Sequence, residues 1–251
     1  MRFQPGTIPH DLGAAPGAKP VAPLNYWVVG ENNPYRHWLV LLCVGAAFGC
    51  AANLIDATWA FGILAQRVRG IPSRYVLRGA YPFMTLGTVA LTWVSVWLLT
   101  SEEPTLRRSR RLVAGALRLL VTGSFLVSSA YVLRLLESFG VQAWTGWFSW
   151  LLQSMDILET LLLWPLLLAI ATRLDFRGLR WRAAVTFTGL LLASVLSAVP
   201  QQTIFQYLSL GPDAFHHFQN FRLATQVLFS TLAALVMVRF AVSFAKEAKT
   251  G

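Results

Sequence analysis

The chain has 251 residues, of which 55% are hydrophobic and 13% are charged, and its mean hydropathy is +0.54. A soluble domain carries roughly 25% charged residues, so this composition excludes a fold that covers its core with polar surface in water. The net charge of +10 does not indicate nucleic-acid binding. Its arginines cluster between apolar blocks, where membrane topology and lipid headgroups favour positive charge.

The first part of the chain, residues 1–37, holds half of the twelve prolines and shows no apolar periodicity. Such a segment is typical of an extended tail. We expect a transmembrane domain over 38–245 and a short second tail over 246–251.

Six apolar blocks follow the tail, each near the length of about 20 residues that crosses a hydrocarbon core as an α-helix. The fifth block is the shortest, and Pro200 allows it to kink at its end. The sequence therefore predicts an all-α fold, a polytopic transmembrane bundle of about six helices. The predicted spans are 38–64, 80–100, 112–136, 148–172, 183–199 and 221–245.

The distribution of Lys and Arg between the blocks predicts the orientation. With the N-terminus in the cytoplasm, the arginine clusters at 107–111 and 173–182 lie inside, whereas the basic loop at 67–78 is an exception on the outside. We therefore expect both termini in the cytoplasm and a bacterial-type inner membrane. The expected partners are the lipid bilayer and helix-packing subunits, without nucleic acid.

Each block carries a stripe of small or polar side chains at three- and four-residue spacing, such as Gly45, Gly49, Asn53 and Asp56 in the first block. Positions separated in this way share one helix face, so every helix can turn its stripe inward. The spacing of Gly45 and Gly49 also fits a close approach of two helices, although GxxxG alone is a weak signal. The stripes predict a compact bundle with a partly polar interior.

Four ionisable residues lie within the blocks: Asp56, Arg118, Asp156 and Glu159. A charge at the bilayer centre costs at least ~2.5 kcal/mol, so these side chains should face one another or a wet cavity. A rise of about 1.5 Å per residue places the two aspartates at one depth and brings Arg118 closest to Glu159. Together with Asn53, they are the candidate substrate- or ion-binding residues.

Two interpretations of these residues remain open. In the structural one, Arg118 and Glu159 form an ion pair and the two aspartates are protonated and hydrogen-bonded. In the functional one, the three acids bind a proton or cation, Arg118 is a counter-charge or anion ligand, and Pro165 lets its helix move.

The histidines before the last block are weaker candidates. His216 and His217 are adjacent and cannot project in one direction from a helix, so a metal site would need ligands from elsewhere, such as Asp213. Asp213 itself is a candidate N-cap that would start the last helix early. The sequence lacks HExxH, CxxC, G-x-S-x-G and a phosphate-binding loop, so it specifies no cofactor and no catalytic residue.

The leading functional hypothesis is a small-solute or proton- or cation-coupled transporter. The alternatives are a non-catalytic membrane scaffold or accessory subunit and, third, an intramembrane enzyme that uses Asp156, Glu159 and the histidines. A water-accessible cavity that reaches the carboxylates favours transport or catalysis, whereas a dry interior with every charge paired favours the scaffold.

Overall fold

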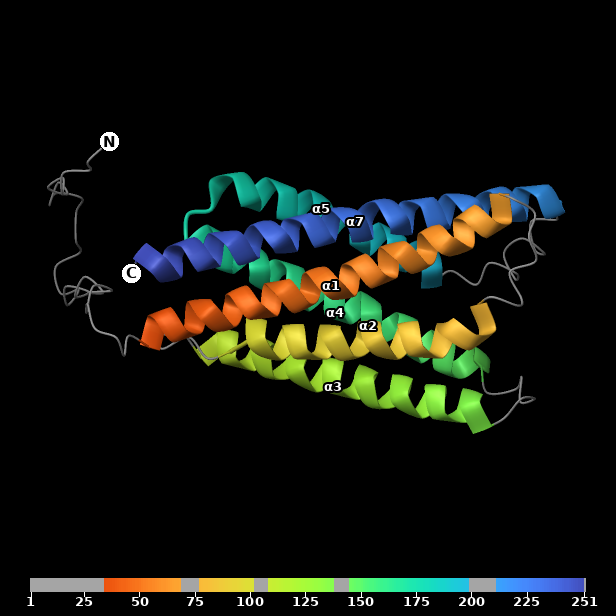
Figure 1. The fold of residues 1–251 in the computed structure, drawn as a ribbon, viewed down its shortest axis with the longest axis horizontal. Coiled ribbons are helices and arrows are strands. Elements are labelled where there is room, and N and C mark those ends of the chain that lie inside the picture. Colours follow the sequence, from red (N-terminus) through yellow and green to blue (C-terminus); the bar gives the residue numbers. More distant parts are fainter. Residues whose placement is uncertain (1–33, 69–76, 102–107, 138–144, 199–210, 251) are drawn as a thin grey trace, which may run out of the picture.

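The computed structural model describes residues 34–68, 77–101, 108–137, 145–198 and 211–250. Within these residues the chain forms α-helices and no strands, which confirms the predicted all-α membrane bundle (Figure 1). Five helices are long and apolar enough to cross a membrane, and a shorter apolar segment lies in α2. The helices are α1 (Pro34–Val68), α2 (Leu77–Leu99), α3 (Arg108–Glu137), α4 (Thr145–Arg173), α5 (Arg177–Ala198) and α7 (Pro212–Thr250).

All six described helices begin earlier than their predicted spans, and two of them begin at a proline. Pro34 starts α1 and Pro212 starts α7, where the missing N–H of proline costs no helical hydrogen bond. The carbonyl of Gly211 accepts hydrogen bonds from the backbone N–H groups of Ala214 and Phe215. The early start of α7 is therefore confirmed, but Asp213 lies inside the first turn rather than at the N-cap. Pro200, as well as residues 1–33 of the predicted tail, lies outside the described residues.

The helices form a closed ring. Each of α1 to α5 packs against the next helix in the chain, and α7 packs against both α5 and α1. The contact between α1 and α7 is the most extensive of these, and the contact between α3 and α4 is the smallest. Neighbouring helices run in opposite directions, so the start of α1 and the end of α7 lie at one end of the bundle (Figure 1). We call this the termini end and the opposite one the far end.

An apolar plug fills the half of the ring near the termini end. Every helix contributes buried side chains to this plug, and the side chains belong to one continuous cluster. The rings of Phe240 and Phe244 stack with centroids 5.6 Å apart, and Phe176 lies 5.9 Å from Phe244. We define the plug as Trp38, Leu39, Leu42, Leu99, Leu117, Leu167, Leu179, Ala183, Phe240 and Phe244.

The predicted glycine contact joins α1 to α2. Ser95 donates a hydrogen bond from its hydroxyl to the carbonyl of Gly45 at 2.8 Å. A Cβ atom at Gly45 would lie 2.9 Å from Cβ of Leu98 and 3.0 Å from the backbone nitrogen of Leu99, and one at Gly49 would lie 2.8 Å from Oγ of Ser95. Only glycine allows this approach, so the expectation from the GxxxG spacing is confirmed.

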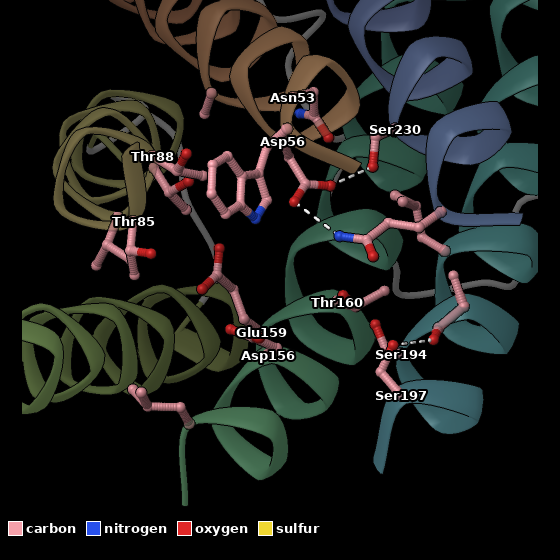
Figure 2. A pocket seen from close by; sticks show the side chains of 18 of the residues that line it. Asn53, Asp56, Thr85, Thr88, Asp156, Glu159, Thr160, Ser194, Ser197 and Ser230 are labelled. Atoms are coloured by element: carbon pink, nitrogen blue, oxygen red, sulfur yellow. Dashed lines mark hydrogen bonds between the residues drawn. The ribbon is translucent and has the colours of Figure 1, made fainter. Parts of the chain in front are cut away.

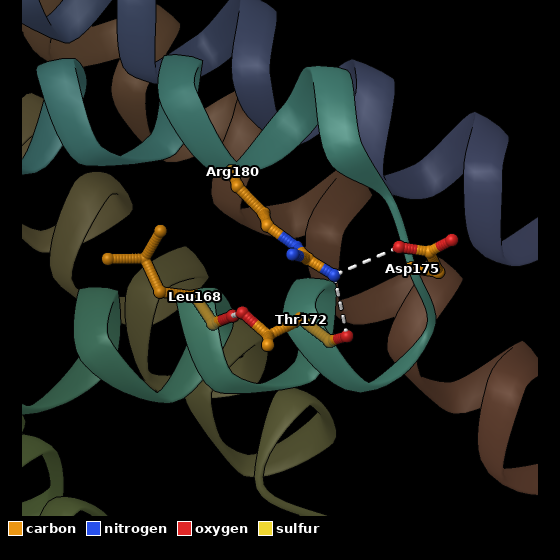
Figure 3. Close-up of polar contacts among 4 residues, drawn as sticks. All are labelled: Leu168, Thr172, Asp175 and Arg180. Atoms are coloured by element: carbon orange, nitrogen blue, oxygen red, sulfur yellow. Dashed lines mark hydrogen bonds and ion pairs between the residues drawn. The ribbon is translucent and has the colours of Figure 1, made fainter.

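The short turn between α4 and α5 is fixed by one arginine (Figure 3). Arg180 donates to the carbonyl of Thr172 at 2.9 Å and to the carboxylate of Asp175 at 3.1 Å. Asp175 has a φ of 53°, in the left-handed region that Asp tolerates better than most residues. Because Arg180 closes the end of α4 from the first turn of α5, the two helices form a tightly connected hairpin.

Candidate functional site

A cavity of about 540 Å³ lies between the helices, and all six described helices line it (Figure 2). It occupies the half of the ring toward the far end. Met237 lines its inner end and also belongs to the buried cluster that contains the plug, so the plug closes the cavity toward the termini end. Hydroxyl and amide groups dominate the polar lining. They include Thr85, Thr88, Thr92, Ser124, Ser128, Gln153, Thr160, Ser194, Ser197, Gln226 and Ser230.

The structure brings four of the five candidate residues to this cavity. Asn53 and Asp56 come from α1, and Asp156 and Glu159 come from α4. The two helices are not neighbours in the ring, so the acids meet across its interior (Figure 2). Asp56 and Asp156 thus line one interior cavity, although the two aspartates were expected on neighbouring helices.

Asp56 is held by neutral donors from α7. The amide of Gln226 donates to one carboxylate oxygen at 2.9 Å, and the hydroxyl of Ser230 donates to the other at 2.5 Å. Gln226 and Ser230 are four residues apart and thus lie on one face of the helix. Asn53 donates to the carbonyl of Gly49 in its own helix at 2.7 Å. Asp56 is therefore fixed in position without a cationic partner.

Asp156 and Glu159 are different, because no hydrogen bond or ion pair within the described residues reaches either carboxylate. They are three residues apart on α4, so they share a face of that helix. The side chain of Asp156 is exposed and that of Glu159 is half-buried. A carboxyl group inside a membrane needs water, a proton or a cation as its partner. The cavity provides the space for such a partner.

Arg118 lies outside the cavity lining, and its predicted ion pair with Glu159 is wrong. Its guanidinium donates to the hydroxyl of Thr100 at 2.8 Å and to the carbonyl of Thr100 at 2.7 Å. It also lies 4.8 Å from the ring centroid of Trp97. The physical reason is that the last carbonyls of α2 lack helical partners, so a cation at that helix end is strongly favoured.

The hydrogen bonds of Arg118 to Thr100 should contribute to the stability of the bundle. We expect Arg118→Leu to lower the free energy of unfolding by roughly 1.5 to 3 kcal/mol, because charged hydrogen bonds to Thr100 are lost. Arg118→Leu and Glu159→Leu should be additive within about 0.5 kcal/mol, since the two side chains share no partner. Chemical unfolding in detergent measures both, with Arg111→Leu on the same helix as control. Recovery in the double variant would restore the ion-pair interpretation.

The cavity also contains a cation that sequence reasoning missed. Arg222 on α7 lines the cavity one turn closer to the far end than Gln226. Its Nε is buried and has no hydrogen-bond partner within the described residues. The predicted span began at residue 221, which placed this arginine at the headgroups. Because α7 begins at Pro212, Arg222 instead lies about three turns inside the helix, and the early start was the signal that could have found it.

The two histidines lie apart from this site. His216 and His217 are exposed near the start of α7 and are absent from the cavity lining. Within the described part of the chain, no group of three or more His, Cys, Asp or Glu side chains is arranged to hold a metal ion. The chemistry of the cavity is therefore that of three carboxylates, one guanidinium and many neutral hydroxyl and amide groups.

Comparison with known proteins finds no match to a family model, to a curated protein or to a solved structure.

Proposed function

We propose that this protein is a membrane carrier that binds a small cationic solute in the acidic cavity and exchanges it for protons. The observation that carries the proposal is the gathering of Asp56, Asp156 and Glu159 in one membrane-interior cavity. The chain as a whole is strongly basic, with 11 acidic residues against 21 basic ones. A cavity with three carboxylates against one guanidinium therefore favours a cation within an otherwise cationic protein.

The size and lining of the cavity favour an organic cation over a bare metal ion. Its volume of about 540 Å³ falls in the range of about 300 to 1,000 Å³ that is typical of small-molecule sites. Trp59 and Trp164 also line it, and aromatic faces attract ammonium groups. We therefore propose a protonated amine as the substrate class, with hydroxyl and amide groups satisfying its other polar atoms.

The three acids would have different roles in this carrier. Asp56 is positioned by Gln226 and Ser230 and would provide a fixed negative charge. Asp156 and Glu159 have no such donors within the described residues and would bind either the ammonium group or protons. Repulsion between these carboxylates is relieved by either ligand, so the solute and the proton should compete.

Release toward the termini end would require the plug to open. The smallest contact in the ring is that between α3 and α4, and α4 contains Pro165 one helical turn after Leu161. Pro165 cannot donate to the carbonyl of Leu161, which weakens the helix at this level. We propose that α4, tied to α5 by Arg180, moves away from α3 during transport.

The scaffold alternative is supported at Arg118, which bonds to Thr100 at the end of α2, and at Asp56. The hydrogen bonds of Asp56 to α7 join two helices, as expected of a structural polar group. A scaffold does not require unpartnered carboxylates on α4 beside an open cavity. The carrier is therefore the function that the geometry supports best.

Uptake into proteoliposomes tests the proposal. With an outward proton gradient, we expect the purified protein to accumulate labelled tetramethylammonium, which has no neutral form that crosses lipid, beyond protein-free liposomes. The double variant Asp156→Asn/Glu159→Gln should lower uptake at least about tenfold, since a lost charge pair typically costs 2 kcal/mol or more. The control Asp213→Asn/Glu247→Gln removes two exposed acids of α7 and should stay within about twofold of the parent.

The other arms of the same experiment separate the alternatives. Labelled rubidium replaces the amine in one arm, and a pH-sensitive dye without solute reports proton flux in another. Transport of rubidium in place of tetramethylammonium would overturn the substrate class but retain the cation carrier. A correctly folded parent that moves none of these probes would overturn the carrier and leave the scaffold.

A further inference from the structure

A second hollow lies at the termini end, between the start of α5 and the last turns of α7. This groove has a volume of about 560 Å³. Its lining includes Leu179 and Arg182 from α5 and Arg239, Val242 and Ser243 from α7, and it shares no lining residue with the acidic cavity. The groove is therefore a separate feature on the outer surface of the ring.

Two arginines meet in this groove from two different helices. Arg182 and Arg239 are both exposed, and no hydrogen bond or ion pair within the described residues reaches either guanidinium. The nearby acid Asp175 is already paired with Arg180. Glu247 lies eight residues beyond Arg239 on α7, about 12 Å along the helix axis. Among the described residues, no counter-charge is paired with these two like charges.

Apolar side chains continue from these arginines toward the middle of the bundle. Val185 on α5 is 39% exposed, and Leu235 and Val238 on α7 are 56% and 45% exposed. Val185 lies one turn from Arg182, and Leu235 lies one turn from Arg239 on the side toward the far end. The two arginines of the groove are therefore followed, outside its lining, by exposed apolar side chains on the same two helices, as a ligand with an anionic head and apolar chains requires.

We propose that this groove is a binding site for an anionic phospholipid of the leaflet at the termini end. The two guanidinium groups hold the headgroup phosphate, for which arginine is well suited because its planar N–H donors match phosphate oxygens. The acyl chains lie against Val185, Leu235 and Val238. An arginine within an apolar span is costly without a counter-charge, and the phosphate supplies one for Arg239.

A bound lipid would join α5 to α7 across the groove, and a ligand that binds only the folded state stabilises it. The test uses the full-length protein in detergent, delipidated and then supplied with phosphatidylglycerol, phosphatidylcholine or inorganic phosphate. We expect native mass spectrometry to show phosphatidylglycerol retained at least about tenfold more than phosphatidylcholine. Phosphatidylglycerol should also raise the thermal unfolding temperature, and inorganic phosphate should not.

Variants locate the site. Arg182→Gln/Arg239→Gln should abolish the preference for phosphatidylglycerol. The control Arg36→Gln/Arg111→Gln removes the same charge from two exposed arginines at the termini end and should keep it. Arg182→Lys/Arg239→Lys should retain part of the preference and tests the site if the Gln variant fails to fold. Equal stabilisation by inorganic phosphate would overturn the lipid in favour of a free anion, and an undiminished preference in the Gln variant would overturn the groove.

Discussion

Replacement of Phe240 by alanine should lower the free energy of unfolding by roughly 3 to 5 kcal/mol and make the protein leaky to ions. Phe240 is 0% exposed and packs on Phe244 within the plug. It lies less than one turn beyond Met237, which lines the inner end of the acidic cavity. Its removal would leave a void between the cavity and the termini end. Denaturant unfolding in detergent and ion leakage from liposomes, followed with an ion-sensitive dye, measure the two effects.

The control for this experiment is the same substitution on the outer face of the same helix. Phe221 on α7 is 58% exposed, so Phe221→Ala should change stability by no more than about 0.5 kcal/mol and leave the liposomes tight. A leak of equal size from both variants would show that the plug does not seal the cavity. Similar losses of stability in both would show that Phe240 is not part of the packed interior.

Alanine at Gly45 should destabilise the bundle by roughly 1 to 3 kcal/mol, whereas alanine at Gly62 should be neutral or stabilise it by up to about 1 kcal/mol. Both glycines lie in α1. The added methyl group at Gly45 would meet Leu98 and the backbone of Leu99 at 2.9 and 3.0 Å, whereas nothing lies within 4 Å of one at Gly62. The backbone of α2 cannot yield as a flexible side chain would, so α1 and α2 must separate.

The opposite signs make this pair of variants informative. The higher helix propensity of alanine over glycine should raise the stability of both the Gly45→Ala and the Gly62→Ala variant. Only a steric contact with α2 lowers the stability of one alone. Thermal unfolding in the same detergent gives the comparison directly, and equal stabilisation of the two variants would contradict the close approach of α1 and α2.

The sequence predicted the helices and, except in α3, the inward faces of the helices, because both depend on local rules. Lipid requires long apolar helices, and a period of 3.6 residues places Asn53 and Asp56 on one face whatever the neighbours are. The same rules brought Asp156 and Glu159 to the interior.

The sequence could not predict which helices are neighbours, and the errors arise there. Arg118 was paired with Glu159 from depth alone, whereas in the ring the end of α2 with Thr100 lies beside α3 and offers unpaired carbonyls. Arg222 was missed because the predicted span began at residue 221, although the alternative start near Asp213 would have placed this arginine inside the helix. The partners of Asp56 were also unpredicted, since Gln226 and Ser230 lie on the last helix.

The closure of the ring by the first and last helices has a consequence for biosynthesis. The hydrogen-bond donors to Asp56 are 170 and 174 residues further along the chain. At about 5 to 20 residues per second, a ribosome needs about 10 to 30 s to add them. During that interval the nascent chain already holds an acid within an inserted helix, and neither of its α7 donors has been made. The newly made protein therefore depends on water, a proton or an insertion factor to shield this acid until its last helix enters the membrane.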